Sequence, residues 1–130
     1  MSVLSPVLAT PADAPLPYSP AVLASGAVRT LYISGQVGID AAGKVPADFE
    51  GQVRAAFANL EQVLAAAGMG LGDLAKVTAF LTDPADYAAY GPLRTELLKG
   101  HKPASTLVIA AALARPEWRF EIEAVAVGAG

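Results

Sequence analysis

The last third of the chain constrains the fold most, because two adjacent segments there have different strand patterns. Residues Ala104–Leu113 are apolar at nearly every position after Thr106, and Pro103 and Pro116 bound the run. A continuous apolar run of this length predicts a strand that is buried on both faces. Residues Arg119–Val127 alternate instead, which predicts a strand with one face toward the core.

The alternation divides the side chains of this second strand into two sets. One set is expected to face the core: Phe120, Ile122, Ala124 and Ala126. The other set is expected to face the opposite way: Glu121, Glu123, Val125 and Val127. Two carboxylates two residues apart on one face lie roughly 7 Å from each other. Taken alone, this pattern indicates solvated carboxylates, or carboxylates paired with Arg115 or Arg119.

The composition limits the classes of protein and partner to consider. With 130 residues the chain can form one core, so we expect a single domain over residues 1–130. The formal net charge of −3 argues against a nucleic-acid partner. The chain has no cysteine and one histidine, so we expect neither a metal nor a cofactor. No segment has the length of a membrane helix and the start does not resemble a secretory signal, so we expect no membrane partner and a cytoplasmic location.

An irregular arm is expected over residues 1–20, which are rich in proline and show little periodicity. Tyr18 lies between two of these prolines, which restrict the backbone and can fix the direction of its phenol. Taken alone, this pattern indicates an aromatic ring packed beneath the arm.

A hairpin is predicted after the arm. Residues Ala21–Ala24 and Thr30–Val37 have strand composition, and Ser25, Gly26 and Ala27 form the turn between them. The second strand ends in Ser34–Gly38, whose glycines predict a bulge or a close approach of the backbone to another group.

A helix is predicted over residues 48–67, where apolar side chains recur every three or four positions. Asp48 is the expected N-cap, and Gly68 or Gly70 ends the helix. The expected apolar stripe consists of Phe49, Val53, Phe57, Leu60, Leu64 and Ala67.

A strand over Leu74–Leu81 and a second helix opened by Asp83 and Pro84 follow. Gly91 and Pro92 are expected to kink this helix, and Gly100 ends it. Its expected inward side chains are Tyr87, Tyr90, Leu93, Leu97 and Leu98. His101 comes next and is expected to be a surface or capping residue.

The predicted order of elements is ββαβαββ, which indicates an α+β fold. Two helices cover one face of such a sheet, so the apolar side chains of the other face need a different cover. We therefore expect a homo-oligomer in which sheets of different subunits pack together, with pockets where the subunits meet.

Six motifs occur in a fixed order along nearly the whole chain: Pro17–Val22 (PYSPAV), Tyr32–Asp40 (YISGQVGID), Asn59–Gly68 (NLEQVLAAAG), Asp73–Asp83 (DLAKVTAFLTD), Pro103–Thr106 (PAST) and Phe120–Val127 (FEIEAVAV). Together they resemble the RidA/YjgF family, the reactive intermediate deaminases. The resemblance implies a chorismate-mutase-like fold and a homotrimer with three clefts between subunits. This implication agrees with the uncovered sheet face.

The resemblance also implies hydrolysis of imines and enamines, such as the 2-aminoacrylate released by pyridoxal-phosphate enzymes, to a keto acid and ammonia. Family members of this kind have an arginine after the Pro-Ala pair that binds the substrate carboxylate, and this chain has Ser105 there. Charge-assisted hydrogen bonds contribute about 1.5–3 kcal/mol against about 1 for a neutral one, so affinity for an anionic substrate should fall at least tenfold. Gly91 replaces an asparagine of the family and is a second departure.

The resemblance assigns residues of this chain to the cleft. Tyr18 forms a wall, Glu121 holds or activates water, and Ser105 presents a hydroxyl in place of the arginine. The topology, rather than the resemblance, makes Arg94 on the second helix a candidate to replace the missing charge. The further binding positions are Ser34, Gly35, Gly91, Thr106 and Leu107.

Two functions from different classes fit these observations. The first is a cofactor-free hydrolase of the imine or enamine deaminase type, whose substrate lacks an amino-acid-like carboxylate and which is therefore not an efficient 2-aminoacrylate deaminase. The alternative is a non-catalytic trimer that holds a small metabolite in the same clefts. The family's older ribonuclease label is disfavoured by the acidic balance of charge. Chorismate mutase activity is disfavoured because its dicarboxylate substrate would need several arginines in one pocket.

Overall fold

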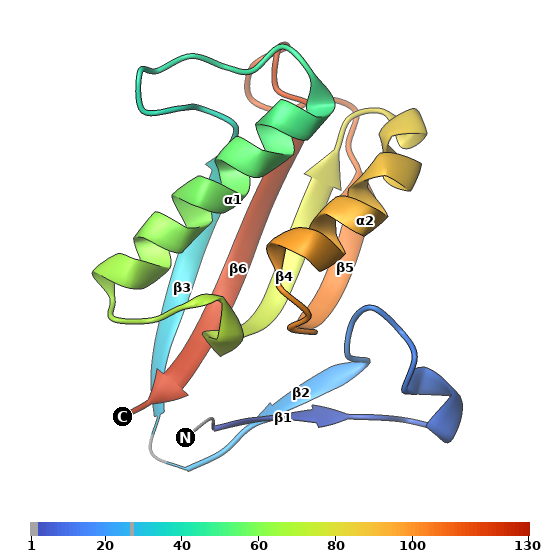
Figure 1. The fold of residues 1–130 in the computed structure, drawn as a ribbon, viewed down its shortest axis with the longest axis vertical. Coiled ribbons are helices and arrows are strands. Elements are labelled where there is room, and N and C mark those ends of the chain that lie inside the picture. The colour runs from blue at the N-terminus through green and yellow to red at the C-terminus, as the bar shows by residue number, and fades with distance from the viewer. Residues whose placement is uncertain (1–2, 27) are drawn as a thin grey trace.

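The structure, a computed structural model, describes residues 3–26 and 28–130 (Figure 1). Within these ranges the strands are β1 (Leu4–Val7), β2 (Ala21–Ala24), β3 (Val28–Val37), β4 (Leu74–Leu81), β5 (Ala104–Ile109) and β6 (Phe120–Ala129). The helices are α1 (Phe49–Ala66) and α2 (Tyr87–Leu97), and short 3-10 turns occur at Pro11–Asp13, Leu71–Asp73 and Pro84–Asp86. Neither α1 nor α2 is long and apolar enough to cross a bilayer.

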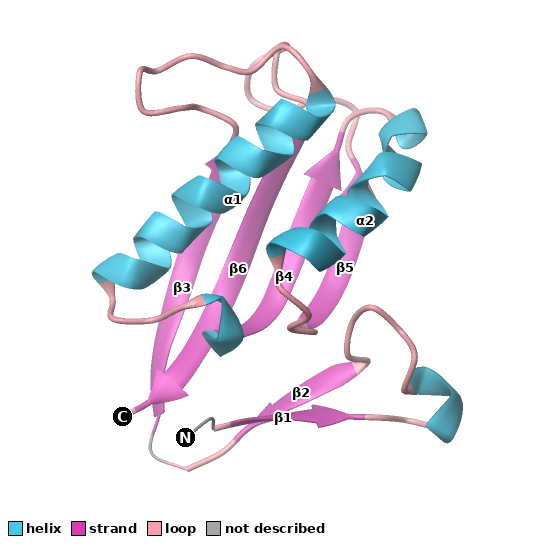
Figure 2. Ribbon diagram, in the orientation of Figure 1, coloured by secondary structure: helices cyan, strands magenta, loops and turns pink. Residues whose placement is uncertain are grey.

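The main sheet has the strand order β3-β6-β4-β5, and both helices pack on one face of it (Figure 2). β5 runs parallel to β4, whereas β6 is antiparallel to β3 and to β4. The predicted α+β class and the placement of both helices on one face are confirmed. Residues paired across strands point to the same face, so the register separates the helix-covered face from the opposite one, here named the open face.

The helix α1 forms where the sequence predicts it. The Asp48 side chain accepts a hydrogen bond from the Gly51 backbone N–H at 3.1 Å, which caps the first turn. Gly68 follows the helix with φ of 71°, a left-handed conformation that suits glycine. The buried residues of the predicted stripe are Phe49, Val53, Phe57, Leu60 and Leu64.

The second helix begins as a 3-10 turn over Pro84–Asp86, capped by the Asp83 side chain, and continues through Pro92 as α2. Of its five expected inward residues, Tyr90, Leu93 and Leu98 are buried, and Leu97 packs against the core. The prediction for Tyr87 is wrong, because its side chain is 61% exposed. Tyr87 is the first residue of α2, and the buried contacts of the helix begin one turn later.

The ring of Phe120 joins both helices to the sheet. It lies 6.0 Å from the ring of Phe49 and 6.3 Å from that of Phe57, both on α1, and 5.2 Å from that of Tyr90 on α2. The predicted alternation of β6 is confirmed here, since Phe120, Ile122, Ala124 and Ala126 are buried beneath the helices. The neighbouring residue Glu121 therefore points to the open face.

Gln52, on α1, fixes the loops at the end of the sheet where β6 begins. Its side chain donates to the carbonyls of Pro46 and Glu117 at 3.0 and 2.8 Å, and accepts from the Arg119 backbone N–H at 2.8 Å. A Cβ on Gly38 would lie 2.7 Å from Gln52 Cα, so β3 approaches α1 closely at this point. The close approach predicted from the glycines of this segment is confirmed.

The prediction of a long strand buried on both faces over Ala104–Leu113 is wrong. β5 ends at Ile109, and it is one of the two edge strands of the main sheet. In the single chain Thr106, Val108 and Ile109 are exposed. An apolar run indicates that a segment is buried, but it does not indicate whether the residues that bury it belong to the same chain.

The predicted hairpin and irregular arm are also corrected. β2 pairs antiparallel with β1 rather than with β3, in the register that places Leu4 opposite Ala24. The arm therefore contains a strand despite its prolines. In a two-stranded sheet one edge of each strand is unpaired, so Pro6, which has no backbone N–H to donate, is tolerated in β1. Met1 in the arm and Ala27 in the predicted turn lie outside the described residues.

Candidate functional site

Glu121 and the end of β3 form the first part of the candidate site. The register of β3 against β6 shifts between Ile33 and Gln36, so Ser34 and Gly35 form the predicted bulge. A Cβ on Gly35 would overlap Oε2 of Glu121 and would lie 2.7 Å from its Cδ. The carboxylate therefore occupies space that only a glycine leaves free. We name Ser34, Gly35 and Glu121 the Glu121 group.

The Glu121 group faces the open side of the sheet. Glu121 is paired with Phe80 of β4, whose neighbours Ala79 and Leu81 are fully buried beneath the helices. Its carboxylate is half-buried, and it has no hydrogen bond or ion pair to another described residue. It is therefore available to a bound molecule. Glu123 lies on the same face and is exposed.

Ser105 and Leu107 lie on the other side of the sheet. Ser105 is paired with Val77 and Leu107 with Ala79, and both partners are fully buried beneath the helices. Because paired residues share a face, the Ser105 side chain points to the helix-covered side. One chain therefore does not bring Ser105 and Glu121 together.

Gly91 and Arg94 are on α2, which lies on the same side of the sheet as Ser105 (Figure 1). A Cβ on Gly91 would meet no atom within 4 Å, so the space beside it is open. The guanidinium of Arg94 lies 5.7 Å from the ring centre of Tyr90, and its Nε is buried without a partner among the described residues. Burial raises the pKa of the Tyr90 phenol, so this ring stays neutral beside the cation.

We name Gly91, Arg94, Ser105 and Leu107 the Ser105 group, because all four belong to the helix-covered side of the sheet. It offers a neutral hydroxyl, an arginine without a described carboxylate partner and an open space on the helix. The Glu121 group offers a half-buried carboxylate. Among the described residues no cluster of three or more His, Asp or Glu side chains could hold a metal ion.

Tyr18 lies beside the start of β5. Ser19 forms an isolated bridge with Ala104, and its N–H and hydroxyl donate to the carbonyls of Pro103 and Lys102 at 3.2 and 2.5 Å. These bonds hold the Tyr18 backbone near Ser105. Tyr18 lines a cavity beside the arm, and its phenol makes no hydrogen bond to a described residue.

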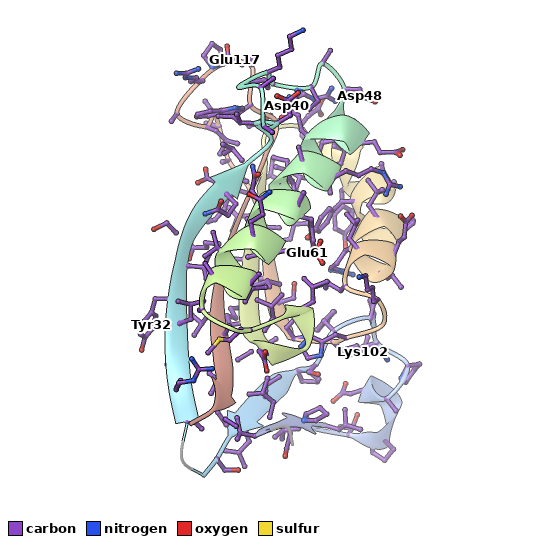
Figure 3. The ribbon with its side chains drawn as sticks, turned by 60° about the vertical axis from the view of Figure 1, so that its left-hand side comes forward. Tyr32, Asp40, Asp48, Glu61, Lys102 and Glu117 are labelled. Carbon is purple, nitrogen blue, oxygen red and sulfur yellow. The ribbon has the colours of Figure 1, made fainter. Side chains whose placement is uncertain are left out.

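Thr106 lies on the open face, opposite in direction to Ser105. Its hydroxyl accepts a hydrogen bond from Lys76 Nζ at 2.6 Å. Lys76 was not among the candidates from the sequence, although the alternation of Lys76 and Thr78 within an otherwise apolar strand is a signal for this polar row. Tyr32, also on the open face, is 79% exposed and projects from β3 into solvent (Figure 3).

Comparison with known proteins gives the family. A family model described as Endoribonuclease L-PSP matches residues 9–128. A 2-iminobutanoate/2-iminopropanoate deaminase from Mus musculus is 39% identical over 113 residues, which cover 85% of this chain and 81% of that protein. These matches extend over the elements that carry both groups of the candidate site.

Two solved structures show the same fold. A protein of unknown function of the conserved Rid protein family, YyfB from Yersinia pestis, superposes with a TM-score of 0.83 at 32% identity over 95% of this chain and 98% of that one. TdcF from Escherichia coli, solved with bound serine, superposes with a TM-score of 0.70 at 31% identity over 88% and 90%. The chain therefore belongs to the RidA/YjgF family, among whose members are proteins named as reactive intermediate deaminases.

Proposed function

We propose that this protein hydrolyses a small imine or enamine in clefts between the subunits of a homotrimer. The observation that carries the proposal is the position of the two groups on opposite faces of one sheet. If both act on one substrate, the Glu121 group of one copy must face the Ser105 group of another. Exposed apolar side chains on the open face, Tyr32 and Val108, favour such packing of a second copy.

The chemistry assigned to Glu121 is proton transfer. Water attacks the carbon of the C=N bond, and Glu121 takes one proton from that water and passes it to the nitrogen. Glu121 then takes the hydroxyl proton of the resulting aminoalcohol and passes it to the nitrogen, so that ammonia leaves as the C–N bond breaks and the C=O bond forms. A carboxylate with no described partner and with partial burial suits both proton steps.

The Ser105 group is proposed to set the substrate class. A serine hydroxyl makes one neutral hydrogen bond, whereas an arginine would bind a carboxylate with two charge-assisted bonds. We therefore propose a substrate without an amino-acid-like carboxylate, with Arg94 and Tyr18 at the cleft wall. The proposal includes no metal, cofactor, nucleic acid or membrane, and it places the trimer in the cytoplasm.

Mixing of two inactive variants tests the shared site. Glu121→Gln removes the proton acceptor, and Ser105→Leu removes the hydroxyl from the other group. Each variant alone should release no ammonia from imines generated in situ. Chains mixed at equal amounts should regain activity in about one site in four, because a shared site draws its two groups from different copies.

The outcome that contradicts this proposal is a mixture that remains inactive while the single wild-type chain is active. A wild-type protein that releases no ammonia but retains a small ligand in the cleft supports the binding-module alternative, which the serine at position 105 favours. Sedimentation of the mixed chains, compared with each variant alone, controls for failure to assemble.

A further inference from the structure

A cavity of about 520 Å³ lies between the β1–β2 sheet and the segment that joins α2 to β5. Of the described residues, neither Ser105 nor Glu121 nor Arg94 lines it, so it is separate from the two groups above. Pockets for small organic molecules occupy about 300–1,000 Å³, and this volume falls in that range.

One wall of the cavity is apolar. Leu4 and Pro6 of β1 and Val22 of β2 contribute to it. Such a wall shelters a hydrocarbon or aromatic body from water, at about 25 cal/mol for each Å² of apolar surface removed. The arm thus completes a pocket that the main sheet does not form alone.

The opposite wall carries a cation that lacks a counter-charge. Lys102 lies between α2 and the arm (Figure 3), and its Nζ donates only a long bond of 3.4 Å to the Ala14 carbonyl. No carboxylate of the described residues lies within 4.0 Å of Nζ. Asp13, which also lines the cavity, instead accepts the backbone N–H groups of Ala9 and Thr10 at 3.0 Å. The ammonium group therefore has donors left for an anion.

Two further polar groups line the same space. His101 has Nε2 2.7 Å from the Leu74 carbonyl, and because a carbonyl only accepts, Nε2 carries the proton. In the neutral ring Nδ1 is then an acceptor. The hydroxyl of Tyr18 can donate or accept, and it has no described partner. The cavity thus combines the Lys102 ammonium with two groups that can hydrogen-bond a second polar atom, and it also contains the Asp13 carboxylate, whose Oδ2 accepts two backbone N–H groups.

We propose that this cavity binds a small organic monocarboxylate with an apolar body, with Lys102 holding the carboxylate. This inference goes beyond the proposed hydrolase, since the cavity shares only Tyr18 with the residues assigned to that cleft and needs no second copy. Binding would also stabilise the arm, because the Ser19 hydrogen bonds to the Lys102 and Pro103 carbonyls join the same segments.

Calorimetric titration with 3-phenylpropanoate tests the proposal, with 3-phenylpropanamide as the uncharged ligand of equal shape. We expect the acid to bind at least tenfold more tightly than the amide. Lys102→Gln should lower the affinity for the acid by a similar factor and leave the affinity for the amide unchanged. The variant should keep the fold of this segment, since the Ser19 hydroxyl bonds to the backbone carbonyl of residue 102 and not to its side chain. Lys44→Gln, a lysine in the β3–α1 loop, is the matched control and should bind like the wild type.

Changes in backbone amide NMR chemical shifts locate the bound ligand, and this measurement does not depend on whether the protein is catalytically active. The expected changes occur in β1, in the arm around Tyr18 and at Gly100–Lys102. Three outcomes overturn the proposal: equal affinity for acid and amide, no effect of Lys102→Gln, or shifts centred on Gly35 and Glu121. Absence of binding at millimolar concentrations of the acid overturns it as well. An inactive protein that still binds in this cavity would refute the hydrolase alone.

Discussion

Replacing Gly35 with alanine should displace the Glu121 carboxylate without unfolding the chain. The added methyl would lie 2.7 Å from Glu121 Cδ and 3.1 Å from Cγ, whereas carbon atoms in contact are about 3.5–4.0 Å apart. The nearest atom, Oε2, would overlap the methyl, so the carboxyl must move by about 1–1.5 Å. It is free to do so, because it is the end of a flexible side chain without a described partner. The φ of Gly35 is not in the left-handed region, so alanine adds no backbone strain.

The expected results are a small change in stability and a large change in rate. Replacement of glycine by alanine at an unstrained position changes the free energy of unfolding by about 1 kcal/mol or less, which is about 4 °C in Tm for a chain of this size. Misplacing a reacting group by about 1 Å lowers the rate about 100-fold. Thermal unfolding and ammonia release from an imine measure the two quantities.

Gly38→Ala is the matched control, since its methyl would lie 2.7 Å from Gln52 Cα and 2.8 Å from the Gln52 carbonyl oxygen. These are backbone atoms that cannot turn away, so this variant should lose about 1–3 kcal/mol of stability and keep its rate while folded. In a Glu121→Gln background, Gly35→Ala should cause no further loss of rate. The reasoning is refuted if Gly35→Ala destabilises the fold as much as Gly38→Ala, or if it retains the wild-type rate.

Three other predictions follow from the same structure. Ser105→Arg should raise the rate of 2-aminoacrylate hydrolysis at least tenfold if the cleft lacks only a carboxylate clamp, and an unchanged rate would show that the cleft differs more widely. Gln52→Leu should lower the free energy of unfolding in urea by about 3 kcal/mol, because three backbone groups lose their partner; a loss below about 1 kcal/mol would contradict this. The Arg54 guanidinium, bonded to Glu96, holds the pKa of that carboxyl below its ordinary 4.5. The stability from this pair is therefore present above the unfolded pKa and is lost as pH falls through the folded pKa. Titration of Glu96 by NMR should return to the ordinary value in Arg54→Gln, and an unshifted wild-type value would contradict the pairing.

The elements that the sequence predicts correctly are those that local patterns define. The period of α1, with its cap at Asp48 and its stop at Gly68, needs no knowledge of distant residues. The same holds for the alternation of β6, which places Phe120 in the core and Glu121 on the open face. Even the bulge at Gly35 is visible as a glycine within a strand.

The incorrect predictions depend on pairing between distant segments. β2 pairs with β1 rather than with β3, and local sequence patterns do not decide between these two partners. Pro6 lies within β1, and because proline is rare in strands β1 is not predicted from the sequence. The apolar character of β5 gave no indication that it is an edge strand. In the candidate site, a motif names Ser105 and Glu121 but not the faces on which they lie, since the faces follow from register.

The register also decides whether the proposed site can form within one chain. Moving Glu121 to the side of Ser105 within one chain would require a shift of β6 by one residue, which would expose Phe120 and bury both glutamates. Burial of unpaired carboxylates is too costly for such a shift to occur. If the two groups share a substrate, activity must therefore depend on contact between the open face of one copy, which carries Glu121, and the Ser105 group of another copy. A charged residue in place of Tyr32, which is exposed in the single chain, should then abolish activity together with assembly while the chain stays folded.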